Sequence, residues 1–102
     1  AERVGAAAAV EAVKLTAEAE RQAAKANLEA ARGAVRVLER TRATARRLLD
    51  VVAQSHELGR GTLADVLMER RRFVEVERAY VEALGAEYDA AVMLNLAMGG
   101  VR

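Results

Sequence analysis

Turn-forming residues are concentrated at one place in this chain, Leu58-Gly59-Arg60-Gly61-Thr62. No proline occurs anywhere in the 102 residues, and proline is the residue that most often ends or kinks a helix. The stretches on both sides of the turn are therefore free to remain helical over their full length. A chain of this size forms at most one domain, so we expect two long helices that meet at this turn.

Apolar or small residues recur every seven positions before the turn. The main series is Val10, Ala17, Ala24, Ala31, Leu38, Ala45 and Val52, and a companion series of Leu28, Val35 and Leu49 lies three or four residues away. This spacing predicts one continuous helix over about residues 2–57, roughly 80 Å long at ~1.5 Å per residue. Gly33 is its one internal weak point, and we expect a close-packing site there rather than a break.

Two interleaved seven-residue series follow the turn. One is Val66, Phe73 and Tyr80, and the other is Leu67, Val74, Val81 and Tyr88. Together they form a stripe that is wider than the seam of a two-stranded coiled coil. We therefore expect the second helix to have a neighbour on each of two sides.

The helix ends carry recognisable capping residues. Thr62 is a good N-cap, and Asp65, three residues later, completes an acidic variant of the capping box. Gly59 and Gly99 can adopt the left-handed conformation that ends a helix. The chain divides accordingly into a long helix, a hairpin tip, a second helix and a tail, at 1–58, 59–61, 62–98 and 99–102.

The predicted fold is all-α: one long antiparallel helical hairpin, a coiled coil with unequal arms and no separate domains. Folding the chain about Arg60 places Met98 opposite Gln22, so residues 1–21 have no partner within the chain. That overhang carries an apolar edge formed by Ala6 to Ala9, Val10, Val13 and Leu15. We expect other copies, or the rest of a parent protein, to cover it.

Composition argues against an enzyme. The chain has 24 alanines, three aromatic residues and no cysteine, so it cannot fill an enzyme-sized core or build a thiolate site. It also lacks a phosphate-binding glycine loop, a zinc-binding His-Glu-x-x-His helix and a serine nucleophile elbow. We expect no catalytic residue, no cofactor and no resident metal.

Charge and hydropathy give two further expectations. The net charge of +1 does not favour nucleic acid as a partner. The longest uncharged stretch, Ala90 to Val101, is shorter than the ~18 apolar residues that a membrane helix needs, so this segment does not itself span a membrane.

Two polar clusters are candidates for binding a metal ion or phosphate groups. His56, near Glu57 and Asp65, could be half of a metal site, but we favour a solvated residue near a helix end because structural zinc takes four ligands. Arginines gather at positions 40–47 and 70–72, with Arg46 and Arg47 level with Arg72 and Phe73. Carboxylates are interleaved with them, so we favour surface ion pairs, such as Glu69 with Arg72, over phosphate binding.

Residues 45–100 resemble the C-terminal repeat of the outer membrane efflux protein family, the TolC-like channels of bacterial tripartite pumps. The resemblance rests on Leu58-Gly59-Arg60-Gly61-Thr62-Leu63-Ala64-Asp65-Val66-Leu67, then Phe73, Glu75, Tyr80, Glu82-Ala83-Leu84, Tyr88 and Leu96-Ala97-Met98-Gly99. Residues 1–45 share only an Ala/Arg/Glu-rich heptad helix with it.

This resemblance implies that the chain is a fragment of an α-helical channel barrel. The parent would be a trimer in the outer membrane and periplasm of a Gram-negative-type bacterium, and each protomer would contribute two such hairpins to the tunnel wall. It also implies that the tip, Leu58 to Thr62, docks the hairpin of the periplasmic adaptor protein. The unequal arms agree with this picture, because the family's long helix continues past its shorter partner.

The resemblance also assigns individual positions. The family's acidic ring at the tunnel mouth maps onto Asp65, whereas the second acidic position of some members is Met68 here. The tyrosine and arginine that lock the tunnel in some members fall at His56 and Gly61, so His56 or Arg60 would have to make the constriction contacts.

Two other readings of the sequence stay open. The coiled-coil hairpin of the periplasmic adaptor (membrane fusion) protein also has a glycine-containing tip and Arg/Ala-rich arms, although the Asp65-Val66-Leu67 helix start fits the channel better. A generic coiled-coil assembly module without a transport role is the other. We expect the isolated fragment to self-associate, because hairpin helices with a two-sided apolar stripe cannot bury both sides alone.

Overall fold

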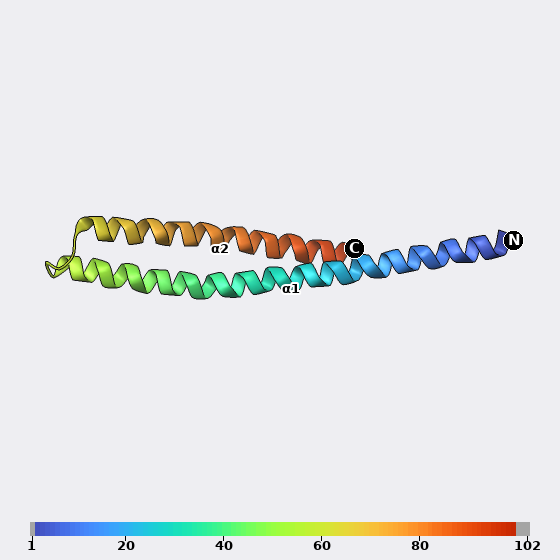
Figure 1. The fold of residues 1–102 in the computed structure, drawn as a ribbon, viewed down its shortest axis with the longest axis horizontal. Helices are drawn as coiled ribbons and strands as arrows, with labels where there is room; N and C mark the ends of the chain where they lie inside the picture. Colours follow the sequence, from blue (N-terminus) through green and yellow to red (C-terminus); the bar gives the residue numbers. More distant parts are fainter. Residues whose placement is uncertain (1, 100–102) are drawn as a thin grey trace.

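The computed structural model describes residues 2–99, which form one antiparallel hairpin of two helices, α1 (Glu2–Glu57) and α2 (Leu63–Ala97). The described chain is elongated, 86 × 25 × 15 Å, and contains no strand. Figure 1 shows that the N-terminal part of α1 continues well past the end of α2. The predicted all-α hairpin with unequal arms is therefore confirmed.

The two helices pack along a single seam with the predicted seven-residue period. On α1 the buried and half-buried seam residues are Ala24, Leu28, Ala31, Val35, Leu38, Ala45, Leu49 and Val52. On α2 the seam comprises Val66, Glu69, Phe73, Val76, Tyr80, Ala83, Glu87, Ala90, Leu94 and Ala97, all of them half-buried. These positions alternate steps of three and four residues, except for one step of seven from Leu38 to Ala45 that passes over the exposed Arg42. This spacing keeps one side of each helix toward its partner.

The core of this hairpin is thin. Among the described residues only Leu28, Val35 and Ala45 are fully buried, with 5 or 6% of their surface exposed. A two-helix hairpin can cover only one stripe of each helix, so every other apolar residue keeps contact with solvent. A large part of the apolar surface of this chain is therefore still uncovered.

The helix ends lie close to the predicted boundaries. Helix α1 ends at Glu57, and α2 begins at Leu63 and ends at Ala97, because Thr62 and Met98 are its caps rather than its first and last residues. Gly99 has a φ of 70°, as the sequence predicts for a helix stop. The rest of the predicted tail, residues 100–102, lies outside the described residues.

The prediction for Gly33 is half wrong. Helix α1 passes through Gly33 without a break. A Cβ atom built there would have Arg36 Nη2 as its nearest neighbour, at 4.0 Å, so no close contact requires a glycine. The reason is its place on the helix: Ala31 and Val35 face α2, and Gly33 between them is turned away from the seam.

Neither helix of the described chain combines the length and the apolar character that crossing a bilayer requires.

Candidate functional site: the hairpin tip and the uncovered helix faces

The tip is a tight turn held by backbone hydrogen bonds. The amide of Gly59 donates to the carbonyl oxygen of His56 at 3.0 Å, and the amide of Arg60 donates to that of Ser55 at 2.8 Å. Gly59 and Gly61 have φ values of 79° and 76°, a left-handed conformation that side chains with a Cβ rarely adopt. The sequence predicted this conformation for Gly59 but not for Gly61. The turn leaves Leu58 67% exposed at the end of the molecule.

Asp65 has a structural partner directly behind the tip. One oxygen of its carboxylate, Oδ2, accepts a hydrogen bond from the Thr62 amide at 3.2 Å, and the Asp65 amide donates to Thr62 Oγ1 at the same distance. The predicted capping box is therefore present. If Asp65 lined a tunnel mouth, the same carboxylate would also cap the start of α2.

His56 lies in the last turn of α1 and is exposed. Within residues 2–99, no three His, Asp or Glu side chains come together in a way that could hold a metal ion. A small hollow of about 260 Å³ lies beside the tip, lined by Val52, Ser55, Gly61, Asp65, Met68 and Glu69. His56 and Arg60, the two candidates for constriction contacts, do not line it.

Some arginines of the two predicted clusters make contacts within the hairpin. Arg42 of α1 donates from Nε to Glu77 Oε1 of α2, and this ion pair raises the pKa of Arg42 above its ordinary value. Arg42 also lies over the ring of Tyr80, 5.2 Å from the centroid. These contacts join α1 to α2 and favour the structural reading of the clusters.

Further pairs lie nearer the tip. Arg46 lies 5.5 Å from the Phe73 centroid and 3.5 Å from Asp50. Arg72 donates to Glu69 at 3.3 Å, as the sequence predicted. The other carboxylate oxygen of Glu69, Oε2, is buried without a hydrogen-bond partner.

The second apolar series of α2 is uncovered. Its members Leu67, Val74, Val81 and Tyr88 are 52, 49, 63 and 71% exposed. Leu63 and Leu84 lie on the same side of the helix and are also exposed. We call this side the α2 free face; it comprises Leu63, Leu67, Arg70, Val74, Glu77, Val81, Leu84, Tyr88, Ala91, Asn95 and Met98.

Helix α1 has a second uncovered face that the sequence analysis missed. Its members follow the same three-and-four spacing, and we call them the α1 free face: Ala9, Val13, Thr16, Glu20, Ala23, Asn27, Ala30, Ala34, Val37, Thr41, Thr44, Leu48, Val51, Ser55 and Leu58. Glu20 is the only charged residue among these fifteen. The absence of charge was the available signal, hidden because most members are alanine or threonine rather than large apolar residues.

The two free faces lie on opposite flanks of the hairpin. Ala23 and Asn27 of the α1 free face line a groove with Asp89, Met93 and Leu96 of α2, none of which belongs to the α2 free face. Glu77 of the α2 free face instead pairs with Arg42, on the flank where Arg46 covers Phe73. Members seven residues apart share a side of the helix, so this assignment extends along each face.

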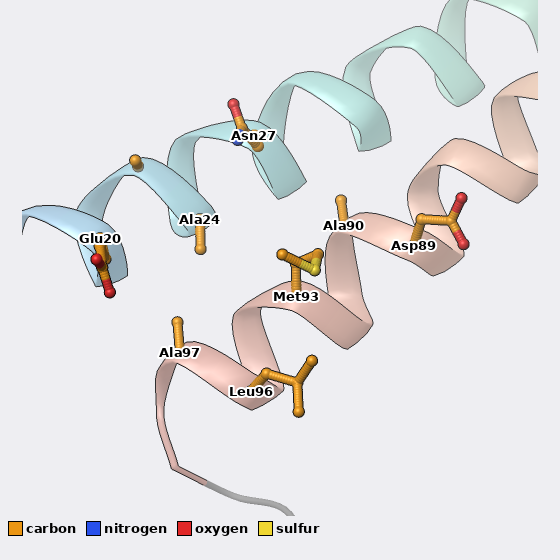
Figure 2. Close-up of a pocket in the computed structure, with 9 residues that line it drawn as sticks. Glu20, Ala24, Asn27, Asp89, Ala90, Met93, Leu96 and Ala97 are labelled. Carbon is orange, nitrogen blue, oxygen red and sulfur yellow. The ribbon is translucent and has the colours of Figure 1, made fainter. Parts of the chain in front are cut away.

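The groove lies at the open end of the hairpin and has a volume of about 580 Å³. In Figure 2, Ala24, Ala90 and Ala97 point toward the space between the helices, whereas Asn27 points away from α2. Two carboxylates, those of Glu20 and Asp89, belong to its lining. Figure 2 also shows the Met93 side chain extending into the space between the helices.

The overhang of α1 is exposed, as predicted. Val4, Val10, Val13 and Leu15 are 54 to 73% exposed. Within this overhang, the Glu18 carboxylate accepts hydrogen bonds from Gln22 at 3.0 Å and from Arg21 at 2.6 Å. These bonds hold the pKa of Glu18 below its ordinary value.

Comparison with protein-family models, with curated protein sequences and with solved structures found no match to this chain. The resemblance to the TolC-like channels therefore rests on the residues that carry it.

Proposed function

We propose that this hairpin is a periplasmic segment of a TolC-like outer membrane channel of a tripartite efflux pump. In that setting the hairpin forms part of the tunnel wall and docks the periplasmic adaptor at its tip. The parent channel would be a trimer in the outer membrane, with this segment in the periplasm.

One observation carries the proposal: each helix uses one face for its partner in the chain and leaves a second, nearly uncharged face exposed over most of its length. Tyr88 is 71% exposed and Val81 is 63% exposed, although they belong to a series with the same seven-residue period as the seam. A hairpin that worked alone would place charge at such positions, because an extended apolar patch promotes association. A helix in a closed wall has a neighbour on each side, which accounts for both faces.

The geometry of the tip supports the docking part of the proposal. Leu58 begins a turn that contains two left-handed glycines, and its side chain is 67% exposed. A small tip with one exposed leucine suits contact with another hairpin tip.

Capture of a purified periplasmic adaptor hairpin tests the docking. The Leu58→Asp variant should lose most of the capture, because the carboxylate would have to be desolvated at the contact. Leu15→Asp is the matched control: Leu15 is 66% exposed, nearly as much as Leu58, but lies at the other end of the molecule. Circular dichroism should show the same helix content for both variants.

Equal capture by Leu58→Asp and Leu15→Asp would show that the tip is not the docking site. A chain that self-associates but captures no adaptor hairpin would instead be a general coiled-coil assembly module. A chain that stays monomeric over a wide concentration range in light scattering would exclude the wall as well.

A further inference from the structure

We propose that the groove at the open end of the hairpin binds an elongated organic dication, with a cationic group at each end and a hydrocarbon chain between them. The inference goes beyond the proposed function, because it concerns a small-molecule site that needs only the two helices of one hairpin. Its basis is the size of the groove, its apolar lining, its charge and the separation of its two carboxylates.

The groove has the size and the apolar lining of a small-molecule site. Its volume of about 580 Å³ lies within the range of ~300–1,000 Å³ that is common for such sites. Six of its nine lining residues are apolar: Ala23, Ala24, Ala90, Met93, Leu96 and Ala97. Met93 is 60% exposed and Leu96 is 49% exposed, so both have apolar surface that a bound hydrocarbon chain would remove from water.

Met93 makes this lining adaptable. Its side chain extends into the space between the helices, where the alanines of both helices leave room beside it (Figure 2). Methionine is unbranched and its thioether is polarisable, so its side chain can adjust to the shape of a ligand. The lining therefore suits a flexible hydrocarbon chain.

The lining carries two negative charges and no positive charge. Glu20 and Asp89 are its only charged residues, and both are exposed. Neither forms an ion pair with another group of residues 2–99, whereas Glu18 and Glu77 each have an arginine partner. Charge complementarity therefore favours a cation as the ligand.

The sequence explains why these two carboxylates have no partner. No lysine or arginine lies three or four residues from Glu20 or from Asp89 in either direction, and this is the spacing that brings side chains together on one helix. Arg21, the neighbour of Glu20, donates instead to Glu18. Helix α2 has no lysine or arginine after Arg78. Within the described chain the groove therefore has no cation of its own.

The two carboxylates lie at opposite ends of the groove, as Figure 2 shows. Contacts between the helices give their relative heights, namely Arg42 with Glu77, Arg46 with Phe73 and Arg42 with Tyr80. The residue numbers of these pairs add to 119 or 122, so Asp89 is about level with residues 30–33 of α1. Those positions lie roughly 15–20 Å from Glu20 along the long axis, at ~1.5 Å per residue. A single small cation cannot contact both carboxylates, whereas a chain with a cation at each end can.

Dodecamethonium is the probe that tests this site. It consists of two trimethylammonium groups joined by a twelve-carbon chain, and hexamethonium has the same ends on a chain of half that length. Carbon-13 labelling of the methionine methyl groups reports binding by NMR. Met93 lines the groove, and Met68, which lies beside the tip, is the internal control.

Dodecamethonium should shift the Met93 methyl signal to saturation and leave the Met68 signal unchanged. Hexamethonium should bind roughly tenfold more weakly, because it covers less apolar surface and reaches one carboxylate at a time. Glu20→Gln and Asp89→Asn should each weaken dodecamethonium binding roughly threefold to fivefold, the effect of one exposed ion pair.

Glu82→Gln is the matched control. Glu82 lies one heptad from Asp89 on the same side of α2, but it does not line the groove. Its replacement should leave the dodecamethonium affinity unchanged. All three substituted positions are exposed, and circular dichroism checks that the helix content is the same in every variant.

Equal losses for Glu82→Gln and Asp89→Asn would overturn the proposal, because they would show a general attraction of cations to the acidic side of α2. A Met93 signal that stays in place, or that moves together with Met68, would overturn it too. Equal affinity for hexamethonium would exclude contact with both carboxylates. None of these outcomes affects the adaptor-docking test, because Leu58 lies at the other end of the hairpin.

Discussion

Arg42 lies over the ring of Tyr80, 5.2 Å from its centroid, at a seam position that is flanked one heptad away on each side by Val35 and Leu49. The guanidinium also pairs with Glu77, so one arginine makes two contacts across the hairpin. An apolar residue at this position would pack more simply but would not fix which residues of α1 and α2 are level. We interpret Arg42 as a register-setting residue.

Replacement of Arg42 should separate its packing from its charge. Arg42→Ala removes the stem, the ring contact and the ion pair, and should lower the thermal midpoint. Arg42→Met keeps an apolar stem over Tyr80 and should lower it less. Glu77→Gln should have the smallest effect, and that effect should shrink as salt is added, because exposed ion pairs are screened. Thermal melts followed by circular dichroism at low and high salt measure all three; a larger loss for Arg42→Met than for Arg42→Ala would contradict the packing role.

Two matched valine truncations should show where the free energy of folding comes from. Val35 is 5% exposed and Val51 is 59% exposed. Val35→Ala should cost about 1–3 kcal/mol, from lost apolar burial and the cavity left behind. Val51→Ala should change the stability by less than about 0.5 kcal/mol in the dilute monomer. Urea unfolding at low protein concentration measures both, and equal losses would show that the seam is not the main core.

The Thr62 cap should contribute measurably to stability. Thr62→Ala removes the hydroxyl that accepts from the Asp65 amide, and should cost about 1 kcal/mol. Thr62→Ser keeps the hydroxyl and serves as the control. Chemical denaturation compares the two variants, and equal stability of alanine and serine at this position would show that the capping box contributes nothing.

Acid should loosen the chain around Glu18. Its pKa is lowered, so its stabilising contribution is present above the ordinary glutamate pKa and is lost as the pH falls through the lowered value. An NMR titration of the Glu18 side-chain carboxyl should give a midpoint below the ordinary glutamate range. Gln22→Ala removes the largest cause and should move the midpoint upward; an unchanged midpoint would mean that the Gln22 bond is not formed in solution.

The sequence predicts the fold well because the seam repeats so regularly. Seven-residue spacing through Leu28, Val35 and Leu49 is enough to place both helices, and Thr62 with Asp65 is enough to place the start of α2. The helix boundaries follow because the only concentrated turn signal lies between two uninterrupted heptad runs.

Other features could not be read from spacing alone. Gly61 takes a left-handed conformation because the turn must reverse within a few residues, which depends on how the two helices approach. The contact of Arg42 with Tyr80 requires the heights of the helices to be known. The α1 free face escaped notice because small residues such as Thr41 and Ala34 carry little hydrophobic signal one by one.

The position of the two free faces on opposite flanks constrains the symmetry of any assembly that uses them. If unlike faces pair, each added copy would cover one face of its neighbour and present a new face of the same kind, so the contact is directional and has no built-in last member. An open row would always expose one face at each end. A closed ring is the arrangement in which neither face of any copy stays in water.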